Sequence, residues 1–119
     1  MLIGFLVVLV SIMSDCIFCK ISNGEIPKEF TYEDEALVVF PDIHPLKPVH
    51  LLIVPKKHVP EFMAVEDHTL FQKIGHVVQK MIKEFDLETR GHRIVINGGG
   101  AQDVDHLHVH LMGPISRHA

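Results

Sequence analysis

Histidine alternates strictly with aliphatic residues from His106 to Leu111, near the C-terminal end of the 119-residue chain. Successive side chains of a β-strand point to opposite faces, so this order predicts a strand with the imidazoles of His106, His108 and His110 on one face. Imidazoles are costly to bury without partners. The pattern therefore favours a functional site, and the alternative is a polar strand face exposed to solvent.

The rest of the fold follows from a change of period along the chain. Apolar residues recur at three- and four-residue steps from Asp67 to Phe85, which predicts one long amphipathic helix with Glu66 or Asp67 as its N-cap. Shorter apolar runs predict strands at Glu29–Tyr32, Ala36–Phe40, His50–Val54, Arg93–Ile96 and His106–Met112. We expect an α+β fold, a mostly antiparallel sheet of about five strands with the helix on one face.

Residues 1–13 form an apolar extension that differs from the domain expected over residues 14–119. The extension is shorter than the roughly 20 residues of a membrane-spanning helix. It also lacks the basic start and the small-residue cleavage site of a signal peptide. We interpret residues 1–12 as an upstream extension from a misplaced start codon, before a natural start at Met13. A membrane anchor, or an added strand or helix, are the alternatives.

Charge and cysteine content limit the functional classes. The net charge is -4 and the sequence has no Lys/Arg run, which argues against binding to a nucleic-acid backbone but not against a small anionic ligand. Cys16 and Cys19 form a C-x-x-C pair in a chain without a convincing secretory signal. A cytoplasmic protein is expected, and metal ligation by this pair is favoured over a redox pair or a structural disulfide.

Two chemistries could use the histidine strand: metal ligation, or nucleophilic catalysis by one imidazole. The turn from Asn97 to Gln102 contains three successive glycines. Glycine allows backbone N–H groups to converge on an anion. A glycine turn before the histidine strand thus indicates a phosphate held beside the imidazoles.

Several motifs beyond the histidine strand resemble one known family. They are Cys16–Ile21, Gly24–Pro27, Tyr32–Glu35, Phe40–Ile43, His50–His58 and His106–Met112, in the family's order. The chain resembles the histidine triad nucleotide-binding proteins, in their nucleoside phosphoramidase branch, from about Asp15 to Gly113.

This resemblance implies catalytic roles for four histidines. His108 would be the nucleophile that forms a nucleotidyl-histidine intermediate. His110 would contact the phosphate and the leaving group, and His50 would support the triad from a neighbouring strand. The backbone carbonyl of His106 would accept a hydrogen bond from His108 and set its tautomer.

The resemblance also implies a site for a purine nucleotide. Asp42 would bind the ribose hydroxyls, while Asn97 and Gln102 would donate to the phosphate or the leaving group. An apolar slot for the base would be formed by Ile17, Phe18, Ile21 and Ile43. Asp103 stands where the family often has Ser, near the phosphate, and could repel an anionic substrate or accept from a leaving amine. Asp105 replaces a common aromatic residue.

The implied cofactor is a structural zinc ion held by Cys16, Cys19, His58 and His106, with a reduced, metal-free cysteine pair as the alternative, and with no organic cofactor and no obligatory Mg²⁺. The resemblance further implies a two-fold homodimer formed through the long helix and a shared sheet. The expected activity is hydrolysis of purine nucleoside phosphoramidates to a nucleoside monophosphate. The alternatives are a dinucleoside polyphosphate hydrolase, or a nucleotide- or zinc-binding interaction module with little turnover.

Overall fold

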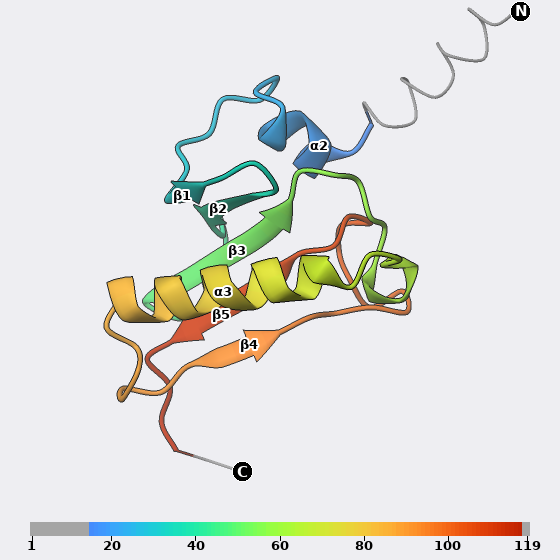
Figure 1. Ribbon diagram of the computed structural model, residues 1–119. Coiled ribbons are helices and arrows are strands. Elements are labelled where there is room, and N and C mark those ends of the chain that lie inside the picture. The colour runs from blue at the N-terminus through green and yellow to red at the C-terminus, as the bar shows by residue number, and fades with distance from the viewer. Residues whose placement is uncertain (1–14, 118–119) are drawn as a thin grey trace, which may run out of the picture.

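The computed structural model describes residues 15–117, so the expectations for residues 1–13 lie outside the described part of the chain (Figure 1). In chain order the elements are α2 (Ile17–Ser22), β1 (Tyr32–Glu33), β2 (Leu37–Pro41), β3 (Val49–Pro55), the 3₁₀ helix η1 (Phe62–Ala64), α3 (Thr69–Glu84), β4 (Arg93–Val95) and β5 (Val109–Gly113). The strands form one antiparallel sheet in the order β1-β2-β3-β5-β4, which confirms the predicted α+β fold.

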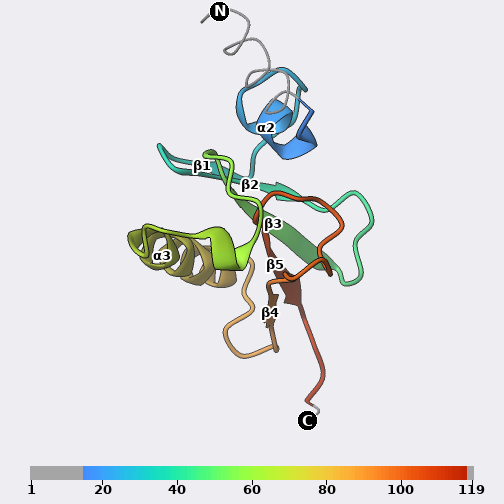
Figure 2. The ribbon, with the colours of Figure 1, turned by 90° about the vertical axis from the view of Figure 1, so that its right-hand side faces the viewer.

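The two faces of the sheet are covered by different helices (Figure 2). Helix α3 packs on one face, and its inward residues meet alternate residues of β2, β3 and β5 in the larger apolar cluster. Helix α2 covers part of the other face through Phe18 and Ile21, which contact Val38, Phe40 and Leu52. The first face provides most of the core, and the second is the face on which the histidines lie.

The predicted alternation of His106–Leu111 holds in side-chain direction but only partly in strand assignment. Leu107, Val109 and Leu111 lie in the cluster beneath α3, so the histidines between them point to the opposite face. Strand β5 begins at Val109, however, because Leu107 donates its backbone N–H to the Val59 carbonyl, outside the sheet.

Most other differences from the predicted elements are shifts at their ends. The first predicted strand, Glu29–Tyr32, is wrong except at its last residue, and β4 stops at Val95 rather than Ile96. The turn before β2 is held by Asp34, whose carboxylate accepts from the N–H groups of Ala36 and Leu37.

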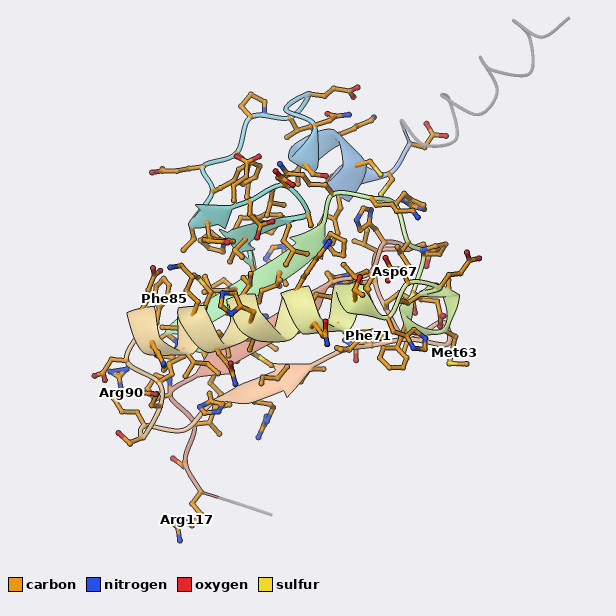
Figure 3. All side chains as sticks on the ribbon, viewed as in Figure 1. Met63, Asp67, Phe71, Phe85, Arg90 and Arg117 are labelled. Atoms are coloured by element: carbon orange, nitrogen blue, oxygen red, sulfur yellow. The ribbon has the colours of Figure 1, made fainter. Side chains whose placement is uncertain are left out.

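Helix α3 begins two residues later than predicted. His68 is its N-cap residue, while Asp67 accepts from the backbone N–H and the hydroxyl of Thr69. Phe71 is not part of the core stripe: its ring contacts Phe62 of η1, and it lies at the opposite end of α3 from Phe85 (Figure 3). No helix within residues 15–117 is both long and apolar enough to cross a membrane.

Candidate functional site

The middle histidine of the triad is held by the backbone next to it. His108 Nδ1 lies 2.7 Å from the carbonyl oxygen of His106. A carbonyl only accepts hydrogen bonds, so Nδ1 carries the hydrogen and Nε2 keeps its lone pair. The ring is buried, and Phe18 of α2 packs edge-on against it at 5.0 Å between centroids. One nitrogen of His108 is therefore a basic acceptor in a fixed orientation.

The outer histidine, His110, is oriented by a chain of hydrogen bonds. The backbone N–H of Leu46 donates to His50 Nδ1 at 3.1 Å, which leaves the hydrogen of neutral His50 on Nε2. His50 Nε2 then donates to His110 Nδ1 at 2.9 Å. His110 in turn carries its hydrogen on Nε2, a buried atom with no hydrogen-bond partner among residues 15–117. Burial, and then the nearby His108 and His50, lower the pKa of His110, so its ring is neutral at pH 7 and Nε2–H is a free donor.

Asp42 connects this pair of histidines to a recess on the surface. Its Oδ2 lies 3.4 Å from His50 Nε2, and its Oδ1 accepts from the backbone N–H of His44. Asp42 and Ile43 line a recess of about 370 Å³ together with residues 28–31 and Pro41. A nucleoside placed there would have a carboxylate beside it and the triad next to that carboxylate.

The residues predicted to form the base slot fall into two groups. Ile17 and Ile43 are exposed, and either could contact a ligand. Phe18 and Ile21 are instead buried in the apolar cluster on the sheet, because α2 turns them towards β2 and β3. In this structure these two residues support the site from below and do not line an open slot.

The glycine turn does not form the predicted cluster of free donors. Gly99 and Gly100 have positive φ, but their N–H groups donate to Glu61 Oε1 and Gln102 Oε1, each at 3.0 Å. The amide nitrogen of Gln102 donates to Asp105 Oδ1 at 3.2 Å. Asn97 is exposed. A bound phosphate would have to replace these contacts to receive the same donors.

Asp103, the residue after this turn, lies close to the nucleophile candidate. Its Oδ1 lies 3.4 Å from His108 Nε2, the nitrogen that has the free lone pair. The side chain is 85% exposed, whereas that of His108 is 3% exposed. The family resemblance implied a position for Asp103 near the phosphate, and in the structure its carboxylate lies beside His108 Nε2.

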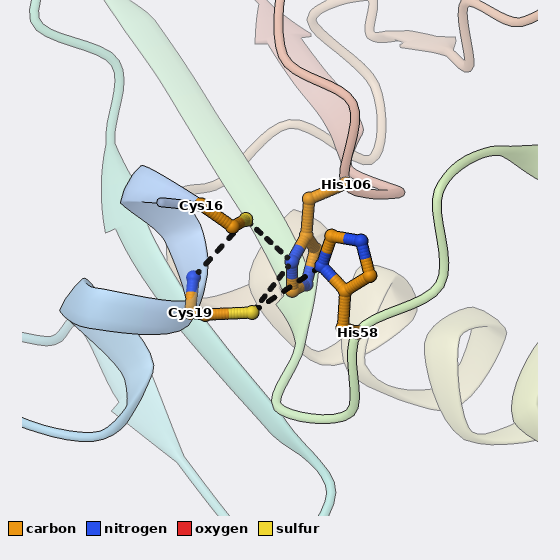
Figure 4. Close-up of side chains that lie close together, drawn as sticks. All are labelled: Cys16, Cys19, His58 and His106. Carbon is orange, nitrogen blue, oxygen red and sulfur yellow. Dashed lines mark hydrogen bonds between the residues drawn. The ribbon is translucent and has the colours of Figure 1, made fainter. Parts of the chain in front are cut away.

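The first histidine of the triad belongs to a second cluster (Figure 4). Its Nδ1 lies 3.2 Å from Cys16 Sγ and 3.5 Å from Cys19 Sγ, and Cys19 Sγ lies 3.3 Å from His58 Nδ1. The four ligand atoms all lie within 4.8 Å of one another. Ligand atoms around a tetrahedral zinc ion are separated by roughly 3.3–3.8 Å, so this donor set fits zinc.

The protonation of this cluster also suits a metal ion. His106 Nε2–H donates to the Pro55 carbonyl at 2.7 Å, which leaves the lone pair of Nδ1 facing the cysteines. Burial lowers the pKa of His106 to about 4, so the ring is neutral. Burial, followed by the nearby Cys16, raises the pKa of Cys19 to about 12. Without a cation Cys19 is a thiol, and a bound cation would displace its proton.

Some contacts of the site have no signal in the sequence. Helix α2 has six residues, too few to show a period, and its N-cap Cys16 accepts from Cys19 N–H through Sγ. The Pro55 carbonyl, the Leu46 N–H and the Glu61 carboxylate are ordinary groups that only the folded chain brings to the site. Nothing in their local sequence could have identified them.

Comparison with known proteins gives consistent matches. The family model described as "Scavenger mRNA decapping enzyme C-term binding" matches residues 15–119. Protein HitA of Neisseria gonorrhoeae is 44% identical over 105 residues, covering 85% of this chain and 97% of its own.

Solved structures agree with these sequence matches. The crystal structure of a HIT family hydrolase from Legionella pneumophila is 41% identical, with a TM-score of 0.79, and covers 85% of this chain and 94% of its own. A zinc-bound histidine triad family protein from Mycobacterium smegmatis is 32% identical, with a TM-score of 0.71, over 84% of this chain and 75% of its own. Together with the triad and its partners, these matches show that the chain belongs to the histidine triad (HIT) family.

Proposed function

We propose that this protein hydrolyses purine nucleoside phosphoramidates through a nucleotidyl intermediate on His108. The observation that supports this most strongly is the 2.7 Å hydrogen bond from His108 Nδ1–H to the His106 carbonyl. It leaves the lone pair on Nε2, and the carbonyl stabilises the charge that the ring gains when Nε2 bonds to phosphorus. The similarity to a HIT family hydrolase supports the same class of reaction.

The reaction divides into two displacements at phosphorus. In the first, the lone pair of His108 Nε2 forms a bond to phosphorus as the bond to the amine breaks, and the leaving nitrogen takes a proton from solvent while His110 Nε2–H donates a hydrogen bond to it. In the second, water attacks the phosphorus, the bond to His108 breaks, and the water gives a proton back to solvent. The products are a free amine and a nucleoside monophosphate.

The remaining groups of the site bind and orient. Asp42 would accept hydrogen bonds from the ribose hydroxyls, with the base beside Ile43 in the adjoining recess. His50 holds His110 with its hydrogen on Nε2, where the leaving group needs a donor. In this proposal no organic cofactor and no Mg²⁺ take part: His110 Nε2–H is a free donor, and the N–H groups of Gly99 and Gly100 would join it once the phosphate replaces their present acceptors.

A zinc ion at Cys16, Cys19, His58 and His106 would have a structural role. It would connect the start of α2 to the segment just before β5 that carries the nucleophile, and leave His108 without a metal bond. The zinc-bound relative from Mycobacterium smegmatis supports this part of the proposal. We further propose a cytoplasmic homodimer that pairs through α3 and the edge strand β4, where Ile94 is 49% exposed.

The assay is release of AMP from adenosine 5′-phosphoramidate by the purified full chain. We expect turnover by the wild type and a loss of at least about 10³-fold in His108→Asn, as usual for removal of a nucleophile. His68→Asn is the matched control, because His68 is an exposed histidine at the N-cap of α3, a position that Asn also favours. Normal turnover by His108→Asn would refute the proposal, and so would an absence of turnover by the wild type.

A further inference from the structure

We propose that Asp103 is a charge filter that selects substrates by the charge of their leaving group. It would favour phosphoramidates with neutral or cationic amines and disfavour polyphosphates, whose leaving group is anionic. This inference rests on the proposed function, since it assumes that His108 attacks phosphorus. It adds the dependence on the charge of the leaving group, and it assigns this selectivity to the side chain of Asp103.

The position of the carboxylate is the first part of the argument. A reacting phosphorus must come within about 3–3.5 Å of the attacking nitrogen before the bond forms. Asp103 Oδ1 already lies 3.4 Å from that nitrogen, His108 Nε2. A phosphoryl group in position for attack is therefore a close neighbour of a carboxylate, and its own negative oxygens are repelled.

The second part is the lack of compensating charge on the same segment. Residues Gly98–His110 contain Asp103 and Asp105 but no Lys or Arg. On the other side of the triad a second carboxylate, Asp42, lies 4.0 Å from His110 Nδ1. Arg90, Arg93 and Arg117 line a separate depression formed by residues 88–93 and 115–117. Asp103 and Asp42 thus place two carboxylates within 4.0 Å of triad histidines, where they repel negative charge on the substrate, while Lys28 lines the recess beside Asp42.

The expected size of the effect follows from distance and exposure. Asp103 is 85% exposed, so it acts mainly through water. If the leaving group lies about 7 Å from the Asp103 carboxylate with water between them, Coulomb's law gives about a threefold change in rate for each unit of charge on the leaving group. Diadenosine tetraphosphate has at least two more negative charges than a phosphoramidate of a neutral amine, which gives about a tenfold bias.

Charge can be separated from shape with three variants. Asp103→Asn removes the charge at nearly constant volume, and Asp103→Glu keeps the charge. Asp86→Asn is the matched control: it makes the same change of charge at an exposed residue on the turn after α3. Asp86 has a φ of 55°, a conformation that Asn also accepts.

The experiment measures kcat/KM for diadenosine tetraphosphate and for adenosine 5′-phosphoramidate with each variant. We expect the ratio of the two values to rise about tenfold in Asp103→Asn and to stay at the wild-type value in Asp103→Glu and Asp86→Asn. We also expect the gap between wild type and Asp103→Asn to close at 1 M salt, where the screening length is about 3 Å.

Two negative results have different meanings. If the wild type hydrolyses the phosphoramidate but the ratio is unchanged in Asp103→Asn, the charge filter is refuted and the proposed function stands. If the wild type hydrolyses neither substrate, the proposed function fails and the filter fails with it. A raised ratio in Asp103→Asn that persists at 1 M salt would also refute the filter, because an electrostatic effect must be screened.

Discussion

His106 combines two roles that substitution by alanine would separate. Its side chain is fully buried: Nε2–H donates a hydrogen bond to the Pro55 carbonyl, and the ring packs edge-on against Phe18 and His58. Its backbone carbonyl, by contrast, orients His108. His106→Ala removes the buried ring and keeps the carbonyl. The structure thus predicts a large loss of stability and a small loss of chemistry.

The expected loss of stability combines two terms. Truncation of a large buried side chain and loss of one buried hydrogen bond together cost about 3 kcal/mol. In a domain of this size, that corresponds to a decrease in Tm of roughly 15 °C. Thermal unfolding followed by circular dichroism measures this shift, with a chelator in both samples so that bound metal does not contribute to the difference.

Activity is measured at a temperature where the variant is folded. We expect phosphoramidate hydrolysis by His106→Ala to stay within about tenfold of wild type, far above a variant that lacks the nucleophile. A folded His106→Ala protein as inactive as His108→Asn would refute the view that the carbonyl of His106 is what orients His108. An unchanged Tm would refute the structural role of the side chain.

Two further predictions concern the metal cluster. Elemental analysis should find one zinc ion per chain in the wild type and none in Cys19→Ser. Zinc binding to the wild type at pH 7 should also release the proton of the Cys19 thiol, whose pKa is about 12 without metal. A wild-type protein that binds no zinc would contradict both expectations. In the metal-free protein, the pKa of His106 is about 4 when folded and about 6.5 when unfolded. The neutral ring therefore contributes about 3 kcal/mol to the free energy of unfolding above pH 6.5, and this contribution is lost as the pH falls towards 4. Chemical denaturation between pH 4 and 7.5 should show this slope in the wild type and a weaker one in His106→Ala, and equal slopes would contradict the assignment.

Periodic features of the sequence predicted the parts of the fold that depend on periodicity. The three- and four-residue steps identified α3, and the alternation from His106 to Leu111 identified which side chains face the core. Short elements held by single contacts could not be predicted in this way. Helix α2 depends on the cap at Cys16. The start of β5 at Val109 depends on the hydrogen bond from the Leu107 N–H to the Val59 carbonyl.

The site shows the same division. The family resemblance brought Cys16, Cys19, His58 and His106 together from distant parts of the sequence, and the structure places their ligand atoms in one cluster. The sequence could not show whether the N–H groups of the glycine turn are free, because that depends on which side-chain acceptors the folded chain brings near them. Gln102 and Glu61 occupy two of the donors that a phosphate would use.

The most direct test is to identify the covalent intermediate. Wild-type protein is mixed with an adenosine 5′-phosphoramidate, quenched within the first turnover under alkaline conditions, and digested for peptide mass spectrometry. We predict one adenylyl group on the imidazole of His108, absent from His108→Asn. An adenylyl group on any other residue, or steady hydrolysis by a His108→Asn protein, would contradict nucleophilic attack by His108.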